Sequence, residues 1–95
     1  MEECRKLEEL RFYKGEKRYV TYEVVSTKNE KVVVTDPTFI LKHNDETIVE
    51  GACEIINSNE IQVLISADDV GSFDLEITYN IGAEIRKVRC KVNVN

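Results

Sequence analysis

The chain carries few residues that could perform covalent chemistry. Its 95 residues include one histidine, His43, and three cysteines, Cys4, Cys53 and Cys90. A cysteine nucleophile needs a general base within hydrogen-bond reach and a third group that orients this base. His43 lies in a polar, turn-forming run, and Cys90 falls on the apolar side of an alternating segment, where a thiol acts as a small hydrophobic side chain. We therefore expect no enzyme, no catalytic residue and no cofactor.

The cysteines also indicate the redox setting. An odd number of widely spaced cysteines fits neither a disulfide framework nor a zinc site. The simple interpretation is free thiols in a protein made in the cytoplasm, and Cys53 could pair with Cys90 only if their strands were neighbours. We expect no membrane-spanning segment and no secretory signal, because no apolar run is long enough for either.

Acidic residues gather in two dipeptides, Asp45-Glu46 and Asp68-Asp69. A calcium site needs several oxygen ligands that converge from rigid loops, and a dipeptide supplies few of them. Turn chemistry accounts for Asp45, and glycoside hydrolysis would need a cleft that holds two carboxyl groups at a defined separation. A calcium- or carbohydrate-binding accessory domain is therefore the alternative hypothesis rather than the main one.

The charge is unevenly distributed along the chain. The net charge is −5, yet residues 1–18 sum to +1, residues 19–84 to −10 and residues 85–95 to +4. The acidic bulk argues against a nucleic-acid partner, because proteins that bind the phosphate backbone present a basic patch. The basic final segment, with Lys87, Arg89 and Lys91, either pairs with acidic neighbours in the fold or contacts an acidic partner.

The start of the chain has a helical pattern. Within residues 2–10, Cys4, Leu7 and Leu10 recur at every third position and helix formers dominate, which predicts a short helix. A helix this short is marginal by itself, so it either docks on the domain or serves as a small oligomerisation handle. We expect residues 1–9 to form this N-terminal segment and residues 10–95 to form the domain.

From residue 10 onward, apolar and polar residues alternate, as they do in strands with one buried face. Tyr22 and Tyr79 fall on apolar sides and are expected in the core, whereas Asp36-Pro37 is expected to break the chain between strands. About seven to nine strands at spacings of ~8–12 residues predict an all-β antiparallel sandwich. The clearest alternating segments are residues 18–26, 61–66, 72–79 and 87–94.

A corner motif opens the penultimate expected strand. Asp69-Val70-Gly71-Ser72-Phe73-Asp74-Leu75 resembles the Asp-x-Gly-x-Tyr-x-Cys run that leads into strand F of immunoglobulin domains. Asp69 and Gly71 match, whereas Phe73 replaces the tyrosine and Leu75 replaces the cysteine. The resemblance implies an immunoglobulin-like β-sandwich of the disulfide-free kind, with Phe73 buried at the corner.

A second resemblance covers most of residues 10–94. Lys14-Gly15-Glu16, Asp36-Pro37, Phe39-Ile40-Leu41, Ile48-Val49-Glu50-Gly51 and a basic final strand follow one another in this order. The order is similar to that of small immunoglobulin-like modules encoded by phages and prophages of Gram-positive bacteria. This resemblance implies a virion-associated tail or baseplate role, or binding to the host surface, and it carries over no functional residue.

The remaining candidates are residues that could contact a partner. Tyr19 lies on the opposite face from Val20 and next to Arg18, so it is either a contact residue or part of a cross-strand pair on a half-exposed sheet. Arg86–Asn95 is a candidate edge strand, whose basic row suits edge protection or an acidic partner. The expected function is a non-enzymatic structural or interaction module. Its expected partner is a second copy in a homo-oligomer, a phage structural protein or a host-surface glycan, and not a membrane.

Overall fold

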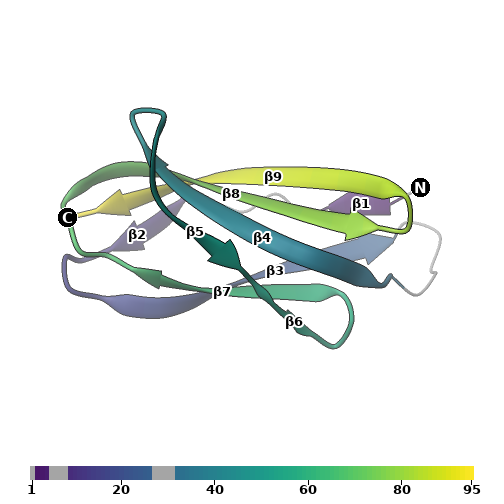
Figure 1. Cartoon of the computed structure of the whole chain (residues 1–95). Helices are drawn as coiled ribbons and strands as arrows, with labels where there is room; N and C mark the ends of the chain where they lie inside the picture. Colours follow the sequence, from purple (N-terminus) through teal and green to yellow (C-terminus); the bar gives the residue numbers. More distant parts are fainter. Residues whose placement is uncertain (1, 5–8, 27–31) are drawn as a thin grey trace.

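The chain folds into two β-sheets that pack face to face (Figure 1). The computed structural model describes residues 2–4, 9–26 and 32–95, which contain nine strands and no helix that could cross a membrane. The strands are β1 (Glu2–Cys4), β2 (Leu10–Phe12), β3 (Lys17–Ser26), β4 (Val34–His43), β5 (Glu46–Ala52), β6 (Glu54–Ile56), β7 (Glu60–Ser66), β8 (Gly71–Ile81) and β9 (Glu84–Val94).

The smaller sheet has the strand order β1-β3-β7-β6, and the larger has the order β2-β9-β8-β4-β5. All neighbouring strands run antiparallel except β2, which runs parallel to β9. After β5, the chain crosses from the edge of the larger sheet to β6 in the smaller one (Figure 1). This arrangement confirms the predicted all-β antiparallel sandwich of seven to nine strands.

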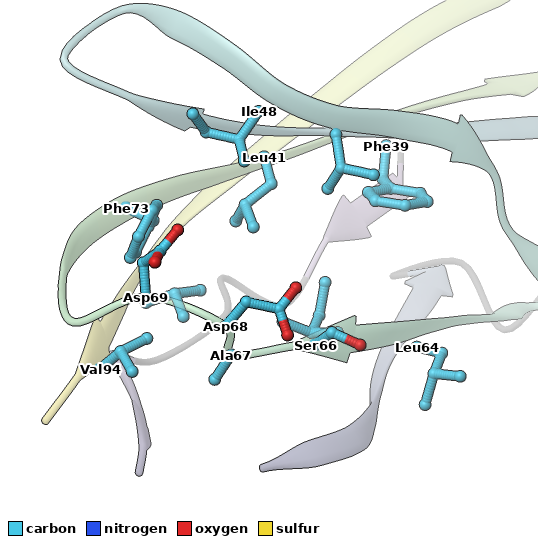
Figure 2. A pocket seen from close by; sticks show the side chains of 13 residues that line it. Phe39, Leu41, Ile48, Leu64, Ser66, Ala67, Asp68, Asp69, Phe73 and Val94 are labelled. Atoms are coloured by element: carbon cyan, nitrogen blue, oxygen red, sulfur yellow. The ribbon is translucent and has the colours of Figure 1, made fainter. Parts of the chain in front are cut away.

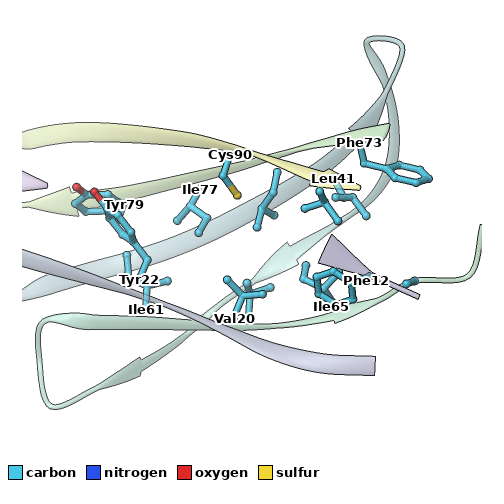
Figure 3. Packing of buried hydrophobic residues seen from close by; sticks show 14 of the residues in the cluster. Phe12, Val20, Tyr22, Leu41, Ile61, Ile65, Phe73, Ile77, Tyr79 and Cys90 are labelled. Carbon is cyan, nitrogen blue, oxygen red and sulfur yellow. The ribbon is translucent and has the colours of Figure 1, made fainter. Parts of the chain in front are cut away.

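The core fills the space between the two sheets (Figure 3). The rings of Tyr22 and Tyr79 approach across this space with centroids 6.2 Å apart, and the two residues are only 1% and 0% exposed. Their predicted burial is therefore confirmed. The alternation of side chains along each strand places every second residue in the core, among them Val20, Val24, Ile61, Val63, Ile65, Leu75, Ile77, Cys90 and Val92.

The helix predicted over residues 2–10 is not seen. Glu2–Cys4 form β1, which pairs with Val24–Ser26, and Leu10 begins β2, while residues 5–8 lie outside the described residues. A short segment that follows a helical pattern gains little from helix formation alone. Pairing with β3 and β9 supplies backbone hydrogen bonds at both ends of the segment instead.

The predicted chain break at Asp36-Pro37 was also wrong, because both residues lie inside β4. The pairing of β4 with β8 shifts register between Thr35 and Thr38, and Asp36 has a φ of +48°. Such a bulge places proline outside the regular ladder, so its missing N–H costs no sheet hydrogen bond. The carbonyl of Pro37 accepts a hydrogen bond from the Cys53 N–H at 2.9 Å, which ties β4 to the crossing between β5 and β6.

Candidate interaction surface

Strand β5 is the exposed outer strand of the larger sheet. All seven of its residues are exposed, and among the described residues it pairs only with β4. The turn before it contains Asn44 and Asp45, whose φ angles of +51° and +65° are those of a tight two-residue hairpin turn. This turn holds one edge of β5 against β4. The opposite backbone edge of β5 stays available for pairing.

Other open edges of the sandwich are short or carry basic side chains, as protected edges commonly do. β1, β2 and β6 have three residues each, and β6 leaves only the four residues Val63–Ser66 of β7 uncovered. The part of β3 that β1 leaves uncovered begins with Lys17 and Arg18. The part of β9 that β2 leaves uncovered carries Lys87, Arg89 and Lys91. In contrast, β5 contains no lysine, arginine or proline, and it exposes Ile48 and Val49 by 51% and 45%.

An apolar groove runs beside β5, between the edges of the two sheets (Figure 2). Its volume is about 400 Å³. Phe39, Leu41, Ile48 and Val49 line it on the larger sheet, and the outer half of β7 lines it opposite. Ile48 and Val49 are exposed here and Phe39 is only partly buried, whereas Leu41 belongs to the buried core. We name this groove, together with the β5 edge, the β5 groove.

One end of the β5 groove is acidic. Asp69 lies there beside Phe73, and Asp68 follows beside Ala67 and Ser66 (Figure 2); both aspartates are exposed. Neither forms an ion pair with a described side chain. A cation brought to this end would therefore meet two carboxylates that have no competing ion-pair partner among the described residues.

The corner motif closes the same end of the groove. Phe73 and Leu75 point into the core, with exposures of 7% and 0%, so the burial implied by the immunoglobulin resemblance is confirmed. Gly71 has a φ of +146°, and a Cβ there would lie 3.4 Å from Cε1 of His43. The His43 ring in turn packs on Phe73 at 5.0 Å between centroids, and its Nδ1 lies 3.0 Å from the Ser72 carbonyl oxygen.

The basic residues of β9 face carboxylates of the neighbouring strand β8. Glu76 lies opposite Arg89, whose Nε donates to Glu76 Oε2 at 3.0 Å, and Lys87 Nζ lies 3.6 Å from Oε1. Lys91 pairs with Asp74 at 3.3 Å. The basic segment therefore has acidic neighbours in its own sheet, which was one of the two interpretations of its charge. Whether these residues also contact a partner stays a prediction.

The Glu76 side chain is only 7% exposed, although its cationic partners are largely solvent-accessible. Burial raises the pKa of this carboxyl. The hydrogen bond from Arg89 and the charges of Lys42, Lys87 and Arg89 oppose that effect, and the net result is a pKa below the ordinary glutamate value. The folded domain thus holds an ionised carboxylate beneath three cations.

Arg18 and Tyr19 do not form one contact surface, because they point to opposite faces of β3. The Arg18 guanidinium lies 4.1 Å from the centre of the buried Phe12 ring and donates to the Arg11 carbonyl, so it closes one end of the core. Tyr19 is 58% exposed and lies opposite Leu64 of β7 on the outer face. Tyr19 remains available to a partner, and its predicted contact role stays a prediction.

Cys53 and Cys90 are free thiols. Burial raises the pKa of both from 9.0 to about 11, and for Cys90 the nearby Asp74 charge adds to the effect. Only the thiolate is nucleophilic, so both are poor nucleophiles at neutral pH. The contacts of His43 described above are with Ser72 and Phe73, not with either thiol, and they offer no Cys–His pair.

These pKa values predict slow alkylation of the folded domain. A thiol with a pKa of about 11 holds roughly 100-fold less thiolate at pH 7 than one with a pKa of 9.0, and the burial of Cys90 slows its reaction further. We expect iodoacetamide to modify Cys53 and Cys90 about 100-fold more slowly in the folded protein than in denaturant. Peptide mapping by mass spectrometry measures each site. Equal rates in both states would show that these thiols are not held in a low-dielectric environment.

The two acidic dipeptides do not combine into a metal site in the part of the chain that the structure describes. Asp45 and Glu46 lie at the start of β5, and Asp68 and Asp69 precede β8. Among the described residues, no three His, Cys, Asp or Glu side chains lie close enough to hold a metal ion. The calcium alternative therefore has no structural observation in its favour.

Sequence reasoning did not identify the β5 groove. The available signal was the pair Ile48-Val49 in a stretch that lacks Lys, Arg and Pro. That signal needs the strand order to be interpreted, because the same residues in a central strand would be ordinary core.

No protein-family model matches this chain, and no curated protein sequence matches it. Solved structures do resemble it. An engineered protein aligns with the whole chain at 9% identity and a TM-score of 0.76, although the chain spans only 20% of that protein. Titin domain M7 aligns over 99% of this chain and 93% of its own, at 11% identity and a TM-score of 0.64. Murine CRIg aligns over 100% of this chain and 98% of its own, at 9% identity and a TM-score of 0.61. Likenesses at such low identity show the fold alone, which is an immunoglobulin-like β-sandwich.

Proposed function

We propose that this immunoglobulin-like domain is a non-enzymatic interaction module that binds a protein partner by adding a strand to β5. The observation that carries the proposal is the exposed β5 edge, which has seven residues, exposes Ile48 and Val49, and lacks the protection of the other edges. An unprotected edge of this length is a template for pairing with another chain.

Strand addition would use both the backbone edge of β5 and the groove beside it. The unpaired backbone groups of an edge strand supply hydrogen bonds to an extended partner, and the neighbouring groove supplies pockets for alternate side chains. The groove beside β5 has apolar walls from both sheets, so a bound strand would bury apolar surface as well as pair its backbone. Both contributions come from one continuous surface.

The proposal also includes a biological setting for this binding. The resemblance of residues 10–94 to phage and prophage modules points to a virion tail or baseplate protein, or to a protein that binds the host surface. Within that setting, a phage structural protein is the partner that best matches strand addition, because a glycan has no backbone to pair with β5.

The proposal is tested by selecting, from a displayed library of random peptides, those that bind the chain. The bait is the full chain, and its Val49→Lys variant introduces a charge at the β5 edge. The matched control is Ile85→Lys, which changes an apolar residue of β9 that is 70% exposed. We expect peptides that bind the unchanged chain and Ile85→Lys, and that lose binding to Val49→Lys. Selection without enrichment, or equal binding to all three proteins, would contradict strand addition at β5.

A further inference from the structure

We infer that the β5 groove selects an extended segment with apolar residues at alternate positions and a lysine or arginine at the end that lies near Glu46. This inference rests on the proposed strand addition and names the chemistry of its partner. Three observations carry it: the direction of the β5 side chains, the apolar lining of the groove and the two aspartates at one end.

The side-chain direction follows from the register of the hairpin. Val49 lies opposite Leu41, and Gly51 lies opposite Phe39, so these residues share the inner face of the larger sheet. A strand paired to the outer edge of β5 would place every second side chain on this same face. Those side chains would enter the groove, while the intervening ones would stay on the outer face.

The groove lining favours apolar side chains at these inward positions. Phe39 lies against the backbone of Gly51, where an added Cβ would come within 3.4 Å of its ring, and this leaves a flat apolar wall. Ile65 of β7, which is buried, lines the groove on the opposite side. β-Branched residues suit both an extended backbone and this narrow apolar space.

The two aspartates determine which charge the partner segment should carry and at which end it should carry it. His43 pairs with Glu46 at the start of β5 and packs on Phe73, so the acidic end of the groove is the end where β5 begins. Asp68 and Asp69 are exposed there and form no ion pair with described side chains. Glu46 is exposed at the same end, which adds to the negative potential. A partner cation at this end is favoured, and a carboxylate is disfavoured.

The β9 edge of a second copy of this chain fits the groove poorly. The uncovered part of β9 directs Val88 and Cys90 toward the core of that copy, and its Lys87, Arg89 and Lys91 already face Glu76 and Asp74. Such an edge could pair with β5 but could not insert side chains into the groove. A flexible extended segment can do both, so we take it as the occupant.

Two synthetic peptides test this inference. Each has eight residues with blocked termini and alternates valine and threonine, and they differ only in carrying arginine or glutamate at both ends. The isotope-labelled full chain is titrated with each peptide, and backbone amide shifts are followed by NMR. We expect the arginine peptide to shift amides of β5 and of Leu64–Asp69, and to bind about threefold to tenfold more tightly than the glutamate peptide.

Charge variants then assign the preference. In the Asp68→Asn, Asp69→Asn double variant, the two peptides should bind with equal affinity. The control is Glu23→Gln, Glu54→Gln, which removes the same charge from the outer face of the smaller sheet and should leave the preference unchanged.

The outcomes separate the two proposals. If both peptides shift β5 amides with equal affinity, strand addition stands and the inferred charge selection is overturned. If neither peptide shifts β5 at millimolar concentration, strand addition itself fails and the inference fails with it. If sedimentation shows a dimer of the unchanged chain that Val49→Lys disrupts, the occupant is a second copy and the inferred partner is wrong.

Discussion

Replacing Phe73 by alanine lowers the free energy of unfolding by about 3–5 kcal/mol. Phe73 is 7% exposed and belongs to the continuous core, where its ring also supports His43. Removing the ring leaves a cavity at the corner that opens β8, and the surrounding strands can collapse into it only in part. A domain of this size has a total stability of about 5–15 kcal/mol, so the loss is a large share of it.

Urea denaturation followed by circular dichroism measures this loss. The control is Val70→Ala at the adjacent corner position, which is 62% exposed and should change stability by less than about 0.5 kcal/mol. Should Phe73→Ala prevent folding altogether, Phe73→Leu leaves a smaller cavity and should retain a measurable, reduced stability. A loss below about 1 kcal/mol for the alanine variant would contradict the burial of the ring at the corner.

The second large effect concerns Glu76. Substitution by glutamine should cost about 1–3 kcal/mol at pH 7, because Arg89 and Lys87 lose a buried, charge-assisted partner. The matched control is Glu84→Gln. Glu84 pairs with Arg86 in the same sheet, but its side chain is 62% exposed, so its loss should cost less than about 1 kcal/mol.

The cost of Glu76→Gln should depend on pH. The pKa of Glu76 is lower in the folded domain than its ordinary value of about 4.3, so its charge stabilises the fold above that ordinary value. The contribution falls as the pH drops below about 4 and disappears below the folded pKa. We therefore expect the stability difference between the unchanged chain and Glu76→Gln to shrink between pH 7 and pH 3. A difference independent of pH would mean that the charge of Glu76 does not contribute.

The strands and their buried faces could be predicted because the signal is local. Tyr22, Tyr79 and Phe73 lie where alternation placed them, since side chains of a strand point to opposite faces with a period of two. Other local signals misled at Pro37, where proline predicted a break, and at Glu2–Cys4, where the spacing predicted a helix. In the first case a bulge absorbed the proline, and in the second the pairing with β3 outweighed a helical pattern.

The sequence by itself determined that this protein is a small all-β sandwich with few residues suited to catalysis and with a basic final segment. Only the tertiary structure decided that the basic residues face Glu76 and Asp74, and that β5 is an exposed edge beside an apolar groove. The physical reason is that burial and pairing depend on which strands become neighbours. Periodicity fixes the two faces of each strand, whereas the strand order decides whether a given face or edge meets the core, a neighbouring strand or solvent.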